Sequence, residues 1–189
     1  MSANPLPILT AEAYLAMDRS AEWKSEFHDG EMFPMEAVSL RHSLIFDNLV
    51  GALRPRLKAI GCRGLPGPLR VRASVSKYVY PDYQIVCGKP QLTDEHADTL
   101  INPKVVIEIL SPSTTGYDHG PKFDLYRRLP SVEEYVLISQ SEPSVEVFSK
   151  QGEKSWSLTI IDNPEQAVHL QSVGIDFPLS ELYDGVEFG

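Results

Sequence analysis

The segment Val105-Val106-Ile107-Glu108-Ile109-Leu110, followed by Ser111-Pro112-Ser113, decides more about the fold than any other part of the chain. Its apolar residues are typical of a strand that is buried on both faces of a sheet. Glu108 interrupts that run, and a buried carboxylate without a partner is costly or takes up a proton. Glu108 therefore needs a cation, unless it stands at the strand end and points into solvent or pairs with an arginine.

A second acidic residue, Asp82, follows Pro81 and opens the apolar segment Tyr83–Cys87, 26 residues before Glu108. By itself a Pro-Asp pair is a common turn dipeptide. If the two segments are neighbouring strands, the two carboxylates form a candidate metal site. Mg²⁺ prefers oxygen ligands and keeps several waters, so two carboxylates and a main-chain carbonyl suffice.

Lys122 supplies a candidate cation for this pair. We expect a helix from 118 to 129, stopped before Pro130, in which Lys122 and Tyr126 share an inward-facing stripe. A lysine in such a place either extends its amine to water or reaches the carboxylates. In the second case it would orient a water or neutralise charge on a phosphate.

The rest of the chain alternates between helix and strand patterns. We expect a helix at 10–17 capped by Thr10, a hairpin at 26–33 turning at Asp29-Gly30, and a helix from 39 to Gly61 that Pro55 kinks or ends early. Expected strands are 69–73, 78–80, 83–87, 104–110, 134–139, 145–149 and 156–161, with a loop at 88–103 and a helical turn at 179–183. The prediction is one α/β domain over 1–189, with one central mixed sheet flanked by helices and a flexible segment at 1–9.

The composition is that of an ordinary globular domain. Of 189 residues, 42% are hydrophobic and 23% charged. No apolar run approaches the roughly 20 residues that span a bilayer, and the first residues lack the pattern of a secretory signal. The two cysteines, Cys62 and Cys87, have no metal-ligand spacing, so we expect reduced thiols and a cytoplasmic protein.

Charge is distributed unevenly along the chain. The net charge is −9, yet residues 41–77 hold eight basic residues and one acid, which leaves −16 for the remainder. Phosphate binding requires a local positive face and not a positive total. The segment is therefore either a DNA-contacting surface or a solvated helix face and strand. The candidate contacts are Arg41, Arg54, Arg56, Lys58, Arg70 and Arg72.

These residues resemble the PD-(D/E)XK nuclease superfamily, which has the restriction-endonuclease-like fold, and within it the Uma family of putative restriction endonucleases. The resemblance covers roughly residues 9 to 188, and 108–114 is its most specific part. The motifs that carry it are Asp29-Gly30-Glu31, Arg41-His42, Tyr80-Pro81-Asp82, Cys87-Gly88, Val106 to Thr114, Lys122-Phe123, Tyr126-Arg127 and Leu182-Tyr183.

The resemblance implies a catalytic set of Asp82, Glu108 and Lys122, and a metal site made by Asp82, Glu108 and the carbonyl of Ile109. Mg²⁺ or Mn²⁺ would be the cofactor, DNA the substrate and a homodimer the assembly. Leu110 stands where the superfamily has its lysine, and Lys122 from the following helix would take that role.

Three further residues are accessory candidates: Glu26, His42 and Tyr126. Glu26 would add a carboxylate, as a glutamate near the first helix does in many superfamily members. His42 either bonds to Glu26 or to the substrate phosphate, or is a satisfied core histidine. Asp118 is interpreted as a helix cap.

Three functions are compatible with these patterns. The leading hypothesis is a metal-dependent endonuclease that hydrolyses DNA phosphodiester bonds. The alternative is a catalytically silent nucleic-acid-binding or interaction module on the same fold, which the net charge of −9 favours slightly. The third is a metal hydrolase acting on a small phosphoester.

Overall fold

Strand β8 (Val105–Leu110) lies inside a six-stranded sheet in the computed structural model of the protein, which describes residues 8–188. All six of its residues are buried, as the sequence predicts for a strand covered on both faces. The sheet order is β11-β10-β9-β8-β6-β3, and β8 runs parallel to β9 and antiparallel to β6. The other members are β3 (Cys62–Pro66), β6 (Tyr83–Cys87), β9 (Glu134–Ser139), β10 (Val145–Lys150) and β11 (Trp156–Ile161).

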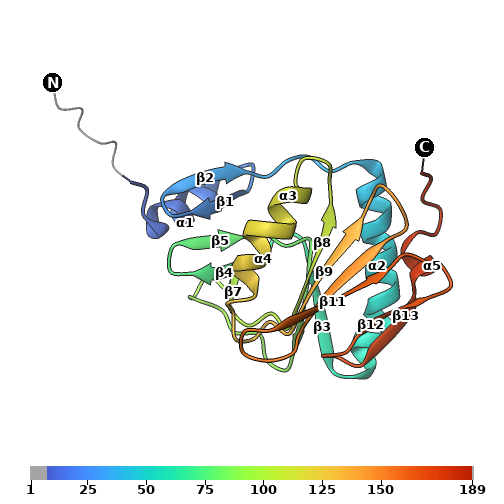
Figure 1. Ribbon diagram of the computed structural model, residues 1–189. Helices are drawn as coiled ribbons and strands as arrows, with labels where there is room; N and C mark the ends of the chain where they lie inside the picture. Colours follow the sequence, from blue (N-terminus) through green and yellow to red (C-terminus); the bar gives the residue numbers. More distant parts are fainter. Residues whose placement is uncertain (1–7, 189) are drawn as a thin grey trace.

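A second sheet of five strands lies beside the first in Figure 1 and was not anticipated from the sequence. Its order is β2-β1-β5-β4-β7, and Asp29 and Gly30 turn the β1–β2 hairpin with φ of 49° and 103°. The predicted α/β class with a mixed sheet between helices is confirmed, but the sheet is divided. The strands are β1 (Ser25–His28), β2 (Glu31–Pro34), β4 (Arg70–Ser74), β5 (Lys77–Val79) and β7 (Thr99–Leu100).

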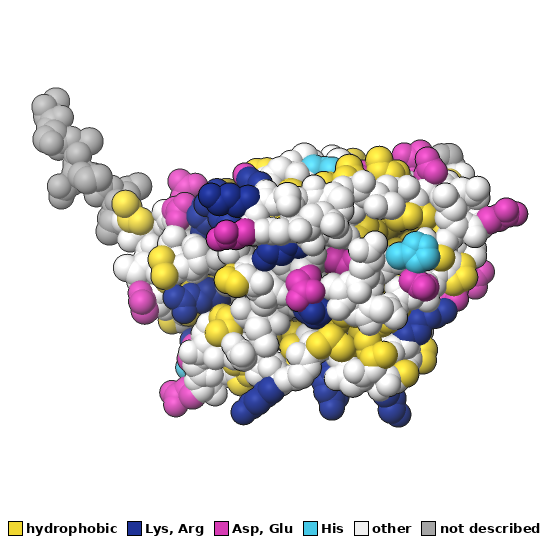
Figure 2. Space-filling model, turned by 60° about the horizontal axis from the view of Figure 1, so that its bottom comes forward, with side chains coloured by type: hydrophobic (Ala, Val, Ile, Leu, Met, Phe, Trp, Pro, Cys, Tyr) yellow, Lys and Arg dark blue, Asp and Glu magenta, His cyan; other side chains and the backbone are white. Residues whose placement is uncertain are grey.

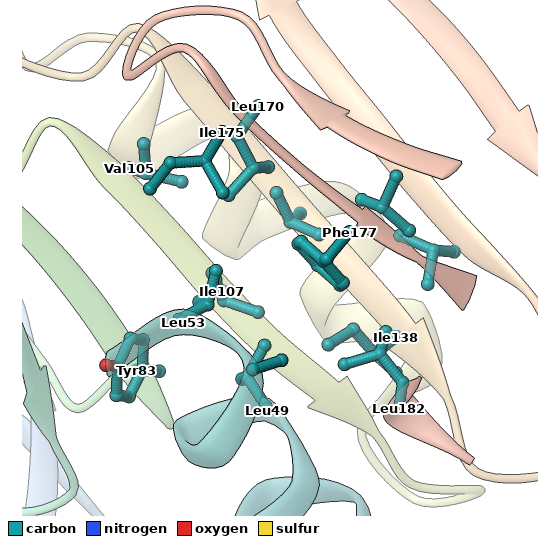
Figure 3. Packing of buried hydrophobic residues seen from close by; sticks show 14 of the residues in the cluster. Leu49, Leu53, Tyr83, Val105, Ile107, Ile138, Leu170, Ile175, Phe177 and Leu182 are labelled. Carbon is teal, nitrogen blue, oxygen red and sulfur yellow. The ribbon is translucent and has the colours of Figure 1, made fainter. Parts of the chain in front are cut away.

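Two layers cover the six-stranded sheet. On one face pack helix α2 (Leu40–Ala59), the hairpin β12 (Ala167–Leu170) and β13 (Ile175–Pro178), and α5 (Leu179–Leu182). Figure 3 shows labelled side chains from α2, β8 and this hairpin converging in that core. The short helices α3 (Thr115–Tyr117) and α4 (Phe123–Tyr126) lie over the other face. The apolar side chains of β8 are therefore shared between two cores.

Of the two effects expected of Pro55, an early end is excluded, because α2 continues to Ala59, close to the predicted end near Gly61. Proline removes one backbone bond and its ring presses on the carbonyl four residues earlier. Burial of Leu49, Leu53 and Leu57 along one face keeps the helix intact beyond the proline. Helix α1 (Ala11–Ser20) likewise exceeds its predicted end, with Thr10 as the N-cap as expected.

The predicted helix at 118–129 begins and ends three residues earlier, and it is not regular. Between α3 and α4 lies a π-helical turn, η1 (Asp118–Lys122), which contains Pro121. Because Pro121 has no N–H, the regular bond to Tyr117 cannot form, and a wider turn accommodates it. The π-turn carries Asp118 and Lys122, both buried.

The expectation of two reduced thiols is contradicted. Cys62 on β3 and Cys87 on β6 are directly opposite in the antiparallel ladder and form a disulfide. The sequence suggested no pairing, because 25 residues separate the two cysteines and strand β3 was not predicted. The disulfide removes the cysteine-based support for a cytoplasmic location.

Within residues 8–188, no helix is long and apolar enough to cross a membrane. The expectation of a flexible segment at 1–9 lies, for residues 1–7, outside the described part of the chain.

Candidate active site

A cleft of about 1260 Å³ opens at the end of β8, between the β2–α2 connection, the start of α2 and the turn that carries Lys122. Asp82, Glu108 and Lys122 all line it, and so does Ile109. The three residues come from the start of β6, the middle of β8 and the π-turn. The fold thus brings together the three side chains that the sequence singled out as catalytic.

Asp82 and Glu108 lie on the same side of the sheet and contact each other's strands. The backbone N–H of Asp82 donates to Glu108 Oε2 at 3.3 Å, and the N–H of Ile109 donates to Asp82 Oδ2 at 2.7 Å. The antiparallel ladder explains this arrangement, because it pairs Tyr83, directly after Asp82, with Ile107, directly before Glu108. The two carboxylates are therefore held next to each other by backbone donors.

Lys122 faces several carboxylates at once. Its Nζ lies 2.9 Å from Glu108 Oε1, 3.4 Å from Glu26 Oε1 and 3.7 Å from Asp118 Oδ1. Tyr126, one helical turn later, donates its hydroxyl to Glu108 Oε1 at 3.2 Å. We call Glu26, Asp82, Glu108, Asp118 and Lys122 the cleft cluster.

Glu26, an accessory candidate from the sequence, lies on β1 of the five-stranded sheet and lines the cleft. Its carboxylate accepts hydrogen bonds from the N–H of Tyr80 at 3.0 Å and from the hydroxyl of Tyr117 at 2.8 Å. Burial raises the pKa of Glu26, but the charge of Lys122 and the hydrogen bonds, His28 included, outweigh it and lower the pKa to about 2. Glu26 is therefore an anion at neutral pH.

Glu108 behaves differently from Glu26. Burial raises its pKa well above the usual value, and Asp118 and Asp82 add to the effect of burial, whereas Lys122 opposes it. Burial also raises the pKa of Asp118. For Lys122, burial lowers the pKa, but Glu108, Glu26 and Asp118 raise it well above 10.5 and keep the amine charged. The single positive charge of Lys122 thus faces more negative charge than it can balance.

His42, on the first turn of α2, lies on the other side of Asp82. Its Nε2 is 3.3 Å from Asp82 Oδ2, and its buried Nδ1 has no hydrogen-bond partner among the described residues. The interpretation of His42 as a satisfied core histidine is therefore wrong, and the carboxylate that it contacts is that of Asp82 and not that of Glu26. The sequence placed His42 on the inward face correctly but could not identify the carboxylate there.

The six basic residues proposed for DNA contact do not gather at the cleft. Arg41 lines it, with its guanidinium donating to the carbonyl of Gln140 at 3.1 Å, whereas Arg54 and Lys58 are exposed on α2 and Arg72 is half-buried on β4. Arg56 pairs with Glu181 at 2.8 Å. Arg70 is 2% exposed and pairs with Asp18 and Asp98, so it is not available to a phosphate.

Sequence reasoning missed Tyr117 and His28 and misjudged Asp118. The hydroxyl of Tyr117 lies 2.8 Å from His28 Nε2, and both side chains line the cleft. The side chain of Asp118 is not an N-cap: the residue follows α3 and begins the π-turn, is buried, and faces Lys122 one turn later. The signal that identifies Asp118 was its spacing of four from Lys122, which places both on one side of a helix.

Among residues 8–188, no three His, Cys, Asp or Glu side chains are grouped closely enough to hold a metal ion by themselves. The carboxylates of Asp82 and Glu108 are adjacent, and each accepts one main-chain N–H bond, through Asp82 Oδ2 and Glu108 Oε2. A divalent ion here would need the Ile109 carbonyl and water to complete its ligands.

Comparisons with known proteins place these features in a family. The chain is 35% identical over 153 residues to an uncharacterized protein of Synechocystis sp., covering 80% of this chain and 86% of that protein. A second uncharacterized Synechocystis protein is 29% identical over 186 residues, covering 97% and 96%.

A crystal structure described as a putative nuclease belonging to DUF820 from Anabaena variabilis has a similar fold. Its TM-score is 0.76 at 20% identity, and the match covers 95% of this chain and 99% of that one. The Uma2 family model, described as "Putative restriction endonuclease", matches residues 11–180, a span that contains the whole cleft cluster. The chain belongs to the Uma2 family.

Proposed function

We propose that this protein is a Mg²⁺-dependent endonuclease that hydrolyses DNA phosphodiester bonds, with Mn²⁺ as an alternative ion. The observation that carries the proposal is the meeting of Asp82 and Glu108 at the end of β8, with Lys122 Nζ 2.9 Å from Glu108. Family membership and the shared fold support a nuclease in general terms. The metal and the DNA substrate are our extension.

The charges of the cleft cluster fit a divalent cation. Lys122 faces the carboxylates of Glu26, Glu108 and Asp118, and Asp82 lies beside Glu108. Burial is the main reason that the pKa values of Glu108 and Asp118 are raised, and neighbouring carboxylates add to the effect. A hard cation prefers such oxygen donors. When bound, the ion would lower the pKa of a water and stabilise charge on the scissile phosphate.

The chain's own residues would prepare this chemistry. The N–H of Ile109 and the ring of His42 fix the Asp82 carboxylate through Oδ2, which leaves Oδ1 directed to other partners. Tyr126 and Lys122 hold Glu108 through Oε1. Lys122, kept charged by its three carboxylates, would orient the attacking water or neutralise the phosphate.

DNA binding by an acidic chain requires a focused positive surface, and the structure offers little of one. On the face shown in Figure 2, dark-blue Lys and Arg side chains stand in several separate places, some beside magenta acidic side chains and some along the lower edge without them. Arg41 is the arginine that lines the cleft. We therefore propose that two copies act together, so that each supplies a site for one strand of the duplex and both contribute cations.

A nucleic-acid-binding or interaction module without turnover is the second candidate, and the net charge of −9 favours it slightly. The cleft's charged lining, besides its histidines, is Glu26, Glu36, Arg41, Asp82, Glu108, Asp118, Lys122 and Glu187. Calorimetry with Mn²⁺ distinguishes the two candidates. Binding that is lost in Asp82→Asn supports a nuclease site, and no binding to the unmodified protein supports the module.

The decisive experiment is a plasmid-nicking assay with Mg²⁺ or Mn²⁺. We expect the unmodified protein to relax supercoiled DNA and both Asp82→Asn and Glu108→Gln to be inactive. Glu187→Gln is the matched control, because it removes one negative charge from the same cleft but none from the cleft cluster. Activity that survives both cluster variants would falsify the assignment. Nitrophenyl phosphate esters in parallel test for a small-phosphoester hydrolase.

A further inference from the structure

Strand β11 forms one edge of the six-stranded sheet, and its outer side has no partner in residues 8–188. It pairs with β10 over its full length from Trp156 to Ile161. No backbone hydrogen bond from these residues to any element besides β10 is present in the described structure. The outer edge therefore presents free N–H and C=O groups over six residues.

The sequence of this edge lacks the usual protection. Proteins keep exposed edges from pairing by placing charges or prolines in them. Trp156-Ser157-Leu158-Thr159-Ile160-Ile161 contains neither, and Leu158 and Ile160 are 47% and 56% exposed. Their neighbours across β10 are Phe148 and Glu146, so the two apolar side chains stand on the α4 face of the sheet where no helix covers them.

Charged residues occur just outside the strand, with opposite signs at its two ends. Lys154 precedes β11 and Asp162 follows it, and both are exposed and without an ion pair in the described chain. Lys154 lies two residues before the strand and Asp162 one residue after it, so an antiparallel self-pairing would bring these opposite charges together.

An antiparallel pairing of β11 with β11 of a second copy would cover the exposed edge and pair the two terminal charges at once. If Leu158 stands opposite Leu158 of a second copy, Trp156 faces Ile160 and Lys154 faces Asp162, twice by symmetry. A shift by one residue would place Lys154 opposite Asn163 and lose both charge pairs.

We propose that the protein forms a symmetric homodimer through β11, in which two six-stranded sheets join edge to edge with Leu158 at the two-fold axis. The partner is a second copy of this chain, because the strand is complementary to itself in backbone, apolar side chains and charge. This interface does not depend on hydrolysis, and its tests measure association alone.

The first test is sedimentation of the purified full chain at several concentrations. We expect a dimer that Leu158→Lys converts to a monomer, because two like charges would meet at the axis. Lys154→Asp and Asp162→Lys should each weaken association roughly tenfold, and the two changes combined should restore it. Val75→Lys is the control, since it changes an equally apolar and 74% exposed residue far from β11 in the sequence. A monomer at all concentrations, or a dimer whose affinity is unchanged by the Lys154 and Asp162 substitutions, overturns the proposal.

The register has a separate test that tolerates weak association. Directly opposite residues in an antiparallel pair have Cα atoms about 4.5–5.5 Å apart, within the range of a disulfide. Leu158→Cys should therefore cross-link two chains under mild oxidation. Thr159→Cys should not, because its partner in this register is Ser157, and the native cysteines are already joined to each other. Equal cross-linking by both variants, or stronger cross-linking by Thr159→Cys, refutes the register.

Discussion

Two clusters of charged residues lie in this molecule, and they differ in how their charge is compensated. The first, the α1 cluster, consists of Asp18, Arg19, Arg70, Asp94 and Asp98. Two arginines form ion pairs with three aspartates, and Asp94 and Asp98 keep about a third of their side-chain surface in water. Hydrogen bonds from Arg19, working against burial and helped by Arg70, lower the pKa of Asp98.

The cleft cluster has the opposite character. One amine faces three carboxylates that are almost fully buried, with Asp82 beside them. Burial raises the pKa of Glu108 and Asp118, the reverse of the effect at Asp98. A cluster whose charges are paired is costly to break, whereas a buried cluster that lacks a cation is a candidate site for a ligand that supplies it. The predictions below test this distinction.

The largest expected effect is on catalysis at Glu108. Glu108→Gln keeps the shape of the side chain but removes one metal ligand, so we expect cleavage to fall at least about a thousandfold. Because the variant also removes uncompensated buried charge, its free energy of unfolding without metal should equal or exceed that of the unmodified protein. Single-turnover cleavage and urea denaturation measure the two effects.

A loss of activity together with a large loss of stability would contradict the comparison, because it would make Glu108 a structural residue like Asp18. Tyr126→Phe is a useful companion. It removes the hydrogen bond to Glu108 Oε1 without changing any charge.

The next effect is on stability at Arg70. Arg70→Met leaves Asp18 buried without its charged partner, and we expect the free energy of unfolding to fall by about 3–4 kcal/mol. The exposed Arg54→Met is the control and should change it by less than about 0.5 kcal/mol. Guanidinium denaturation followed by fluorescence gives both values. If Arg70→Met unfolds no more easily than Arg54→Met, the α1 cluster is not a structural unit.

The two clusters also show what the sequence could predict. Glu108 was found because it interrupts an apolar strand, and Asp82 because it opens the next one, so both were visible as local departures from a pattern. Arg70 was assigned to DNA contact because it lies in a basic segment. Its partner Asp18 is 52 residues away, and no local pattern reports such a pairing.

The lack of a local signal for long-range contacts also explains the other differences between the predicted and the observed elements. Elements with a strong local pattern, such as the periodic helix α2 and the apolar strand β8, were predicted, whereas β3, β7, β12 and β13 were not. Burial of Trp156 or pairing of β5 with the β1–β2 hairpin depends on tertiary contacts that short segments do not encode. The π-turn at Pro121 was unforeseen because proline signals an interruption without specifying its geometry.

A smaller effect is expected at His42, which contacts the carboxylate of Asp82. His42→Ala should weaken Mn²⁺ binding about 10–100-fold, because residues that orient a metal ligand have effects of this size. His42→Gln can still donate a hydrogen bond and should recover part of the loss. Calorimetry with Mn²⁺ measures both variants, and equal affinity in His42→Ala and the unmodified protein would exclude this role.

The smallest expected effect is on the pH dependence of the free energy of unfolding, which should have opposite directions in the two clusters. Burial raises the pKa of Glu108 in the folded chain above its usual 4.5, so the folded state holds a proton that the unfolded state has released. Stability from this group is present below pH 4.5 and is lost as the pH rises through the folded-state pKa, at up to about 1.4 kcal/mol per pH unit. Asp98 has a lowered pKa, so its contribution is present above pH 3.8 and is lost as the pH falls.

Denaturation at a series of pH values, with the unmodified protein and Glu108→Gln side by side, isolates the Glu108 contribution. The difference between the two proteins should grow in favour of the variant as the pH rises above 4.5. Mn²⁺ should remove it, because a bound cation compensates the carboxylate that burial penalises. Parallel curves for the two proteins would mean that Lys122 alone neutralises Glu108, and then the cleft cluster, like the α1 cluster, would need no ion.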